Sequence, residues 1–414
     1  MIRSVFTSST NRNQIINHLA GLLLFFVPLS KAYPNILLIP LLLLVGYDIY
    51  REKKLNLSFS TPYLLLSLSI FFFVLIAVIK GSLFLDIDIY LKYFTVLVLM
   101  IVYQQVSKIK TVENYYLSGL FIAIVISILK IIEYKKVNPD FLFTTGQGIN
   151  DVLWEDRPYA AFMLVLGVFV CLRRISLENK KSWFFVLIAG IFLVFCNYIS
   201  ARLSLFLAIV TIIHFMLFRF KIDFKTKAIS IIILFLGVTT MAVLNKSLLM
   251  RTPLDNSSEF EKMIKVAKDR EPRSVIWNCA SILLKTDTNA LWGVSNHQQS
   301  RQDLVDCYGE QIINREEKRH YYMSIRFNTH NQFFDLWLNG GIIPFLFLVA
   351  SFIFALFSKQ TSPNMRWVFF LFFCFFMVEN VLYRQMGFLL FGVFISIYNT
   401  KLSSKTVDKN SKDF

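Results

Sequence analysis

The fold is decided by two stretches of the chain, Pro62–Ile79 (PYLLLSLSIFFFVLIAVI) and Ser182–Ala201 (SWFFVLIAGIFLVFCNYISA). Neither stretch contains a charged residue. A helix that crosses the hydrocarbon core of a bilayer needs about 20 apolar residues, so each stretch is long enough to be a membrane span. Both runs are continuous rather than alternating, which predicts helices and not the strands of an outer-membrane barrel.

Runs of this kind recur along the whole chain. Of its 414 residues, 56% are apolar and 17% charged, whereas a soluble domain has about 45–50% apolar and about 25% charged residues. These numbers exclude an ordinary cytosolic enzyme, a secreted domain and a disordered tail. We predict an all-α polytopic membrane protein with about twelve transmembrane helices. The predicted spans are 15–30, 34–50, 62–79, 87–104, 115–133, 158–172, 182–201, 203–218, 228–245, 332–357, 366–379 and 385–400.

The distribution of Lys and Arg predicts the orientation of these spans. With both termini placed in the cytoplasm, the cytoplasmic segments carry 21 Lys and Arg and the short outside loops carry 7. Such a bias follows the positive-inside rule. The net charge of +16 is therefore largely a topology signal, and no nucleic-acid partner is expected.

One long polar segment, residues 246–331, interrupts the apolar runs. Its 13 basic and 11 acidic residues nearly balance, and a loop of this length is usually functional. We expect a small helical cap on the outside. One helix is predicted over Glu259–Arg270, and a second begins at Pro272, since proline suits a first helical turn. Apolar residues of the second helix and of a third form one face each: Val275, Ile276, Cys279, Ala280, Ile282 and Leu283, then Leu304, Cys307, Tyr308 and Ile312.

The chain is thus divided into helices 1–9 (1–245), the cap (246–331), helices 10–12 (332–400) and a cytoplasmic tail (401–414). Two of the five cysteines, Cys279 and Cys307, fall in the cap. In an oxidising compartment they can form a disulfide, and the sequence leaves open whether they do.

Three residues that could carry chemistry are expected at the outer face of the membrane. Arg202, in YISAR, lies in the tight turn between spans seven and eight; Arg273, in RSVIW, opens the second cap helix; and His330, in NTHN, lies where the cap re-enters the membrane as span ten. An arginine fork suits phosphate. A histidine in the first turn of a helix is favoured as the neutral imidazole, the form a general base needs. The simpler interpretations are a lipid-headgroup anchor for the arginine and a capping or packing role for the histidine.

Taken together, these residues resemble those of the O-antigen ligase and O-antigen polymerase superfamily. The resemblance rests on Ser200–Ser204, on Arg273–Trp277 followed by Leu291–Gly293, and on the pair His330-Asn331. In the ligases, nine residues separate such a pair from a glycine, as Gln332–Gly340 separate it here from Gly341. The ligase pattern next has Gly, Thr or Tyr three positions on, where this chain has Pro344, a departure that concerns the substrate subtype.

The resemblance implies a metal-independent, inverting glycosyltransferase of type C without cofactors, in the bacterial inner membrane with the large loop periplasmic. Its donor would be an oligosaccharide on undecaprenyl pyrophosphate, and its acceptor a hydroxyl of lipid A–core. It gives His330 the role of general base, and Arg202 and Arg273 that of binding the pyrophosphate. Asn331 would orient His330.

Further outside residues are weaker candidates for holding donor or acceptor: Arg157, Glu379 and Arg384. Glu379 and Arg384 can equally pair with each other. Asp86 and Asp88 in an outside turn are either a metal-binding pair, as in many type-C enzymes, or a helix cap; we expect no metal.

Three other functions stay open on the sequence. A polymerase of O-antigen or capsule would use a lipid-linked glycan as acceptor, and a protein O-glycan ligase would use a protein hydroxyl. A transporter or flippase belongs to a different class. Transporters often contain inverted repeats, and this sequence has no recognisable internal repeat.

Overall fold

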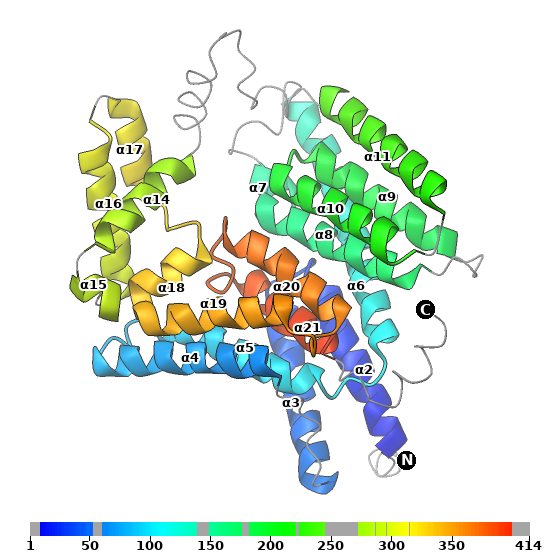
Figure 1. Cartoon of the computed structure of the whole chain (residues 1–414), viewed down its shortest axis with the longest axis horizontal. Coiled ribbons are helices and arrows are strands. Elements are labelled where there is room, and N and C mark those ends of the chain that lie inside the picture. The colour runs from blue at the N-terminus through cyan, green and yellow to red at the C-terminus, as the bar shows by residue number, and fades with distance from the viewer. Residues whose placement is uncertain are drawn as a thin grey trace. The chain divides into compact units, whose positions relative to one another are not determined.

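The structure, a computed structural model, describes residues 9–52, 60–138, 149–175, 182–220, 223–244, 272–285, 287–294, 296–313 and 315–399. Over these residues the chain is helical and has no β-strand (Figure 1). This confirms the predicted all-α class. In chain order, the helices are α2 (Ser9–Phe26), α3 (Ala32–Glu52), α4 (Thr61–Ile79), α5 (Ile87–Tyr103), α6 (Ile109–Val137), α7 (Ile149–Val152), α8 (Arg157–Arg174), α9 (Trp183–Tyr198), α10 (Arg202–Phe218), α11 (Phe224–Leu244), α14 (Pro272–Leu283), α15 (Asp287–Trp292), α16 (His297–Gln311), α17 (Glu316–Ile325), α18 (Gln332–Gly340), α19 (Ile342–Phe357), α20 (Pro363–Phe376) and α21 (Gln385–Ile397).

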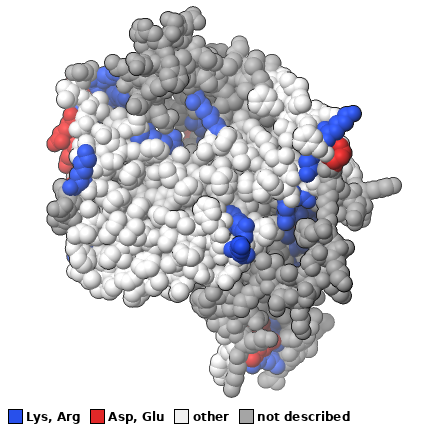
Figure 2. Space-filling view, viewed as in Figure 1, with Lys and Arg blue, Asp and Glu red and all other residues white. Residues whose placement is uncertain are grey.

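Every apolar run that predicts a span forms helix. By length and composition, α3, α4 and α6 are long and apolar enough to cross a membrane, while α9, α10, α19, α20 and α21 are apolar helices of 10–17 residues. Figure 2 shows an uncharged surface over α4 and α19, as suits contact with lipid tails. In the part of the chain that the structure describes, the fold is thus all-helical with helices suited to a membrane, and the total of about twelve spans stays a prediction.

The tenth predicted span is two helices rather than one. Gly341 has φ +76° and separates α18 from α19. A Cβ at this position would collide with the carbonyl oxygen of Leu291. The continuous reading of 332–357 was wrong, because the apolar pattern hides the need for a left-handed glycine at the junction.

The chain forms two compact units, and each is discontinuous in sequence. The first comprises residues 1–43 and 108–263, and the second residues 44–107 and 264–414. In the first unit, α2 packs on α6, and α8 packs on both α9 and α10. Between Tyr159 and Leu172 every residue of α8 is buried. At the end of α8, Arg173 Nε donates to the buried Glu113 at 2.7 Å. Arg173, one of the basic residues predicted on the cytoplasmic side, thus also forms an ion pair within the protein.

In the second unit, α4 packs along α19 and α5 packs on α21. Polar side chains join these helices: Ser69 donates to the carbonyl of Pro344 at 2.7 Å, and Ser351 donates to that of Pro62 at 2.7 Å. Such bonds matter in a lipid environment because a buried hydroxyl left without a partner there costs several kcal/mol.

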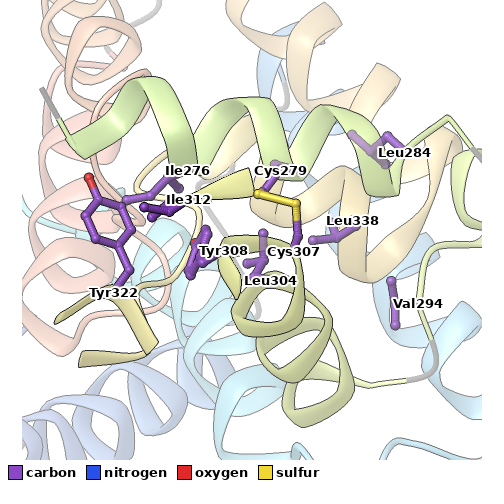
Figure 3. Packing of buried hydrophobic residues seen from close by; sticks show 11 residues of the cluster. Ile276, Cys279, Leu284, Val294, Leu304, Cys307, Tyr308, Ile312, Tyr322 and Leu338 are labelled. Carbon is purple, nitrogen blue, oxygen red and sulfur yellow. A yellow bond between two sulfur atoms is a disulfide. The ribbon is translucent and has the colours of Figure 1, made fainter. Parts of the chain in front are cut away.

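The described part of the cap, from Pro272 to Asn331, also belongs to the second unit. Helix α14 begins at Pro272 as predicted, and α16 contains the predicted third apolar face, while Glu259–Arg270 and the tail 401–414 lie outside the described residues. Around α14 and α16, eleven buried residues form one cluster (Figure 3). The cluster comprises Ile276, Cys279, Ala280, Leu284, Val294, Leu304, Cys307, Tyr308, Ile312, Tyr322 and Leu338.

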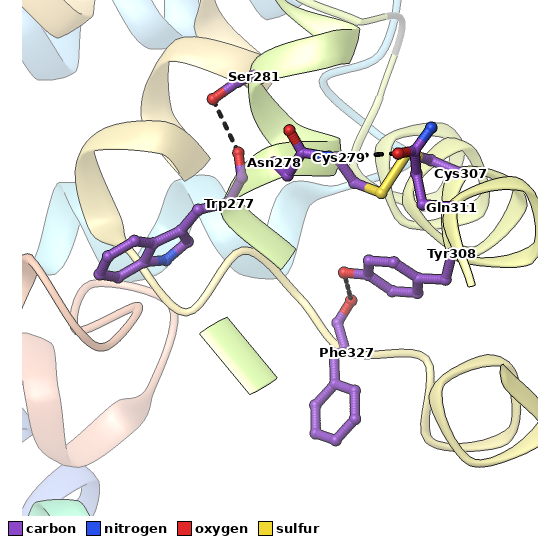
Figure 4. Close-up of a disulfide and its surroundings, with 8 residues drawn as sticks. All are labelled: Trp277, Asn278, Cys279, Ser281, Cys307, Tyr308, Gln311 and Phe327. Carbon is purple, nitrogen blue, oxygen red and sulfur yellow. Dashed lines mark hydrogen bonds between the residues drawn. A yellow bond between two sulfur atoms is a disulfide. The ribbon is translucent and has the colours of Figure 1, made fainter. Parts of the chain in front are cut away.

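A disulfide between Cys279 and Cys307 crosses this cluster and joins α14 to α16. Beside it, Asn278 donates to Gln311 at 3.3 Å, and the hydroxyl of Tyr308 donates to the carbonyl of Phe327 at 3.2 Å (Figure 4). The sequence left this pairing open, and the structure contains it.

Removing the disulfide is expected to destabilise the cap. A cross-link closing a loop of 28 residues contributes about 3–4 kcal/mol in the loop-entropy account. The variant Cys279→Ser/Cys307→Ser should therefore be cleaved in the cap by protease at a lower denaturant concentration than the wild type. Equal sensitivity of the two proteins would contradict the expectation, and the wild type treated with dithiothreitol is the matched control.

The cap is fixed to the helices of its own unit through backbone groups. The amide of Val294 donates to the carbonyl of Leu338 at 2.7 Å, and Gly293 has φ +75° where a Cβ would lie 2.7 Å from the same carbonyl oxygen. At the end of α4, Lys80 Nζ donates to the carbonyl of Val294 at 2.7 Å, and burial lowers the pKa of Lys80 to about 8. Leu291–Gly293 and Gly341, two of the segments on which the family resemblance rests, are thus in contact where the cap meets α18 and α19.

Candidate functional site

Arg273, His330 and Glu379 come together in the second unit, although they lie on three separate segments. The carboxylate of Glu379 bridges the other two: Oε1 lies 3.1 Å from Nη2 of Arg273, and Oε2 lies 3.4 Å from Nδ1 of His330. Arg273 Nε also donates to the carbonyl of Val378 at 3.3 Å. The Glu379 side chain is 8% exposed, whereas those of Arg273 and His330 are 31% and 28% exposed. The carboxylate is therefore buried behind two basic groups that a ligand can reach.

This arrangement assigns the two nitrogens of His330. An ionised carboxylate only accepts hydrogen bonds, so the contact with Glu379 places a proton on Nδ1. In the neutral ring Nε2 then carries a free lone pair and can act as a base. The distance of 3.4 Å is long for a hydrogen bond, and such contacts commonly shorten only when substrate binds.

The backbone of His330 is in the left-handed region, with φ +43°. That conformation is uncommon for a residue other than glycine and costs about 1–3 kcal/mol. It is held by the side chain of Asn328, which accepts from the His330 amide at 3.1 Å. The sequence predicted His330 in the first turn of a helix, but α18 begins at Gln332 and His330 lies in the turn before it.

Asn331 is the N-cap of α18. Its side-chain oxygen accepts from the amides of Phe333 and Phe334 at 2.9 and 3.1 Å, which satisfies two of the donors a helix start leaves open. Its Nδ2 donates to the carbonyl of Met377 at 3.0 Å. The contact to His330 is made by Glu379 instead, and binding of substrate by Asn331 stays a prediction.

Sequence reasoning missed a buried polar network behind the histidine. Asn380 Oδ1 accepts from the amide of Asn331 at 2.7 Å and from the hydroxyl of Thr329 at 3.0 Å, and Asn380 Nδ2 donates to Asp335 Oδ1 at 3.0 Å. The available signal was Asp335, an acidic residue within an apolar run. The network fixes the His330 turn to the segment that carries Glu379.

The remaining candidates are placed as follows. Arg384 is the N-cap residue of α21 and lines a polar pocket in the second unit, while Glu379 pairs with Arg273 and His330. Arg202 and Arg157 belong to the first unit, where they begin α10 and α8. The structure describes the two units separately, so the proximity of Arg202 or Arg157 to His330 stays a prediction.

Arg202 is exposed and follows a tight turn in which Ser200 has φ +56°. The sequence around it, Tyr198–Arg202, was predicted to be such a turn between spans. Near Arg157, Glu155 pairs with Lys31 at 3.6 Å. Each of the two arginines is thus the first residue of an apolar helix.

Asp86 does not cap its helix through its side chain, as one interpretation of the sequence expected. It occupies the N-cap position of α5 without a capping bond, and its Oδ2 accepts from the amide of His297 at 2.9 Å. Burial raises the pKa of Asp86. Asp88 pairs with Lys92 at 3.3 Å. Among the described residues, no group of three or more His, Cys, Asp or Glu side chains is placed to hold a metal ion.

Comparison with known proteins identifies no relative of this chain among families or curated proteins. No family model matches the chain, and no curated protein matches it significantly.

Proposed function

We propose that the protein is a glycosyltransferase of the O-antigen ligase type. It would transfer an oligosaccharide from undecaprenyl pyrophosphate to a hydroxyl of lipid A–core at the periplasmic face of the bacterial inner membrane. The observation that carries the proposal is the buried carboxylate of Glu379, which holds an accessible histidine and an accessible arginine together. A base and a cation side by side are what transfer from a pyrophosphate to a hydroxyl requires.

The chemistry follows from the two basic groups. His330 Nε2 takes the proton of the acceptor hydroxyl while its oxygen attacks the anomeric carbon of the donor. The bond between that carbon and the pyrophosphate oxygen breaks, so the configuration at the anomeric carbon inverts. Arg273, with Arg202 as the second cation, stabilises the negative charge on the leaving pyrophosphate. Glu379 stabilises the imidazolium that forms, as a carboxylate does beside a catalytic histidine.

Two further observations support this proposal. The disulfide between Cys279 and Cys307 suits a cap in an oxidising compartment such as the periplasm. The apolar helices suit an enzyme whose donor and acceptor are both anchored in a membrane. Undecaprenyl pyrophosphate and the glycosylated acceptor are the products.

The glycolipids of the host test the proposal and separate it from its alternatives. Deletion of a ligase should leave bare core together with accumulated long donor, whereas deletion of a polymerase should leave core carrying one repeat unit. Deletion of a protein O-glycan ligase should leave the core unchanged. Complementation with Arg202→Ala should fail to restore transfer if Arg202 supplies the second cation. Normal glycolipids after complementation with each of the Ala variants of Arg202, Arg273 and His330 would reject the assignment.

A further inference from the structure

An apolar groove lies in the first unit, between α6 and α9. Both helices pack on α8, and the groove between them has a volume of about 690 Å³. Its walls are apolar side chains, with the hydroxyl of Tyr198 at one end. The walls include Ile124, Ile128 and Ile131 from α6 and Leu187, Gly190 and Val194 from α9. The mechanism proposed above uses none of these residues.

A guest can reach the walls of this groove. The side chains of Leu187 and Val194 are about half exposed, at 51% and 50%, and a Cβ built on Gly190 would meet no atom within 4 Å. Exposed apolar patches commonly mark binding sites. In a membrane, however, ordinary lipid tails are as apolar as the groove itself. Selection of one lipid must therefore come from the shape of the groove and from the charge at its end.

One end of the groove is basic. Lys135 lies four positions after Ile131, and residues four apart share one face of a helix, so Lys135 continues the stripe of α6 that lines the groove. Its ammonium group lies 5.9 Å from the centre of the Tyr198 ring, at the last residue of α9. This cation–π contact spans the end of the groove. The predicted topology places that end at the outer face of the membrane.

Two more cations follow at the same ends of these helices. Lys136 comes directly after Lys135, and Arg202 begins α10 after the turn that follows α9. All three side chains are exposed, and within the described ranges none of them pairs with a carboxylate. Glu133 lies two positions before Lys135 and therefore on the opposite side of α6. The outer end of the groove thus presents positive charge to an anionic ligand.

We propose that this groove holds the isoprenoid chain of the lipid-linked donor, with the diphosphate of the donor bound by Lys135 and Arg202. The inference rests on the proposed function and adds a lipid-binding groove to it. A single groove accommodates the single chain of this lipid better than the two chains of a phospholipid. The open space at Gly190 suits a methyl-branched chain, and several cations suit a diphosphate, which carries more negative charge than a phosphodiester.

Photolabelling of the full-length protein in nanodiscs tests the proposal. The probe is undecaprenyl diphosphate with a photoreactive group in its isoprenoid chain, and mass spectrometry locates the label. We expect the label on the residues of α6 and α9 that line the groove. An excess of unlabelled undecaprenyl diphosphate should displace the probe, whereas an equal excess of phosphatidylglycerol should not.

Gly190→Phe fills the groove without displacing an atom of the protein, because a Cβ at Gly190 meets open space. It should weaken binding of undecaprenyl diphosphate about tenfold, equal to about 1.4 kcal/mol. The affinity for inorganic pyrophosphate, which has no chain, should not change. Gly237→Phe is the matched control, because Gly237 lies on α11 and a Cβ there also meets nothing within 4 Å. It should bind both ligands as the wild type does.

Lys135→Gln removes the charge at the end of the groove and should weaken binding of both ligands, by up to about fivefold for an exposed ion pair. Lys130→Gln is the matched control for charge. Lys130 is an exposed lysine of the same helix, and five positions before Lys135 it lies on the side of α6 away from the groove. It should bind both ligands as the wild type does.

Three results would overturn the proposal. Phosphatidylglycerol may not displace the probe as well as undecaprenyl diphosphate does, because that is the behaviour of ordinary lipid contact. The label must not fall outside α6 and α9, as it would if a second copy of the chain covered the groove. Gly190→Phe must not bind the probe as tightly as Gly237→Phe.

These readouts are independent of transfer. Loss of transfer in His330→Ala with equal binding by Gly190→Phe and Gly237→Phe would reject the groove and keep the enzyme. Binding of the probe in the groove without transfer by the wild type would support the groove and reject the enzyme.

Discussion

His330→Gln is expected to lower the rate constant for glycan transfer by about 10²–10⁴-fold, the usual contribution of a general base. Glutamine can still donate a hydrogen bond to Glu379, which lies 3.4 Å from the histidine ring, so the local packing is largely kept. It cannot accept a proton from the acceptor hydroxyl. The measurement is a single-turnover assay with purified protein, lipid-linked donor and acceptor.

His320→Gln is the matched control, because His320 is an exposed histidine of the same cap. It should transfer glycan at the rate of the wild type. If His330→Gln also did so, His330 would be a packing residue, which was the simpler interpretation of the sequence.

Arg273→Ala is the second variant with a large expected effect, a loss of about 10²–10³-fold in the same rate constant. The loss has two origins: the leaving pyrophosphate loses a cation, and Glu379 loses the partner at 3.1 Å that balances its charge. Arg273→Lys should fall between the wild type and the alanine variant, since lysine keeps the charge but not the planar fork.

Lys285→Ala removes a positive charge from an exposed position of the cap just after α14, and it serves as the control for charge alone. An equal loss in Lys285→Ala and Arg273→Ala would show that the overall charge of the cap, and not the Glu379 pair, governs the reaction. Full activity of Arg273→Ala would remove Arg273 from the mechanism.

Local features of the structure could be predicted from the sequence, and for a physical reason. Apolar runs of about 20 residues have to form helices in a membrane because no water satisfies their backbone there. Pro272 begins α14 as expected because proline suits a helix start whatever the tertiary context. The apolar faces of α14 and α16 meet in the buried cluster of the cap. They could be predicted because the helical spacing of the apolar residues places them on one side of each helix.

The missed features all depend on contacts between distant residues. Glu379 lies more than 100 positions from Arg273, and its pairing with Arg273 rather than with a neighbour in the chain cannot be read from spacing. Gly341 looked like part of an apolar span, and only the carbonyl of Leu291 packed against it shows why the helix breaks.

We propose that the group of Arg273, Glu379 and His330 catalyses the formation of a glycosidic bond. Its most direct test is to incubate the purified protein with undecaprenyl-pyrophosphate-linked glycan, labelled at the anomeric carbon, and lipid A–core, and to follow that carbon by NMR. We expect a new glycosidic linkage of inverted configuration, with one undecaprenyl pyrophosphate released per bond formed and no product from His330→Gln. Donor that stays intact, or that only moves across the bilayer of a proteoliposome, would contradict it.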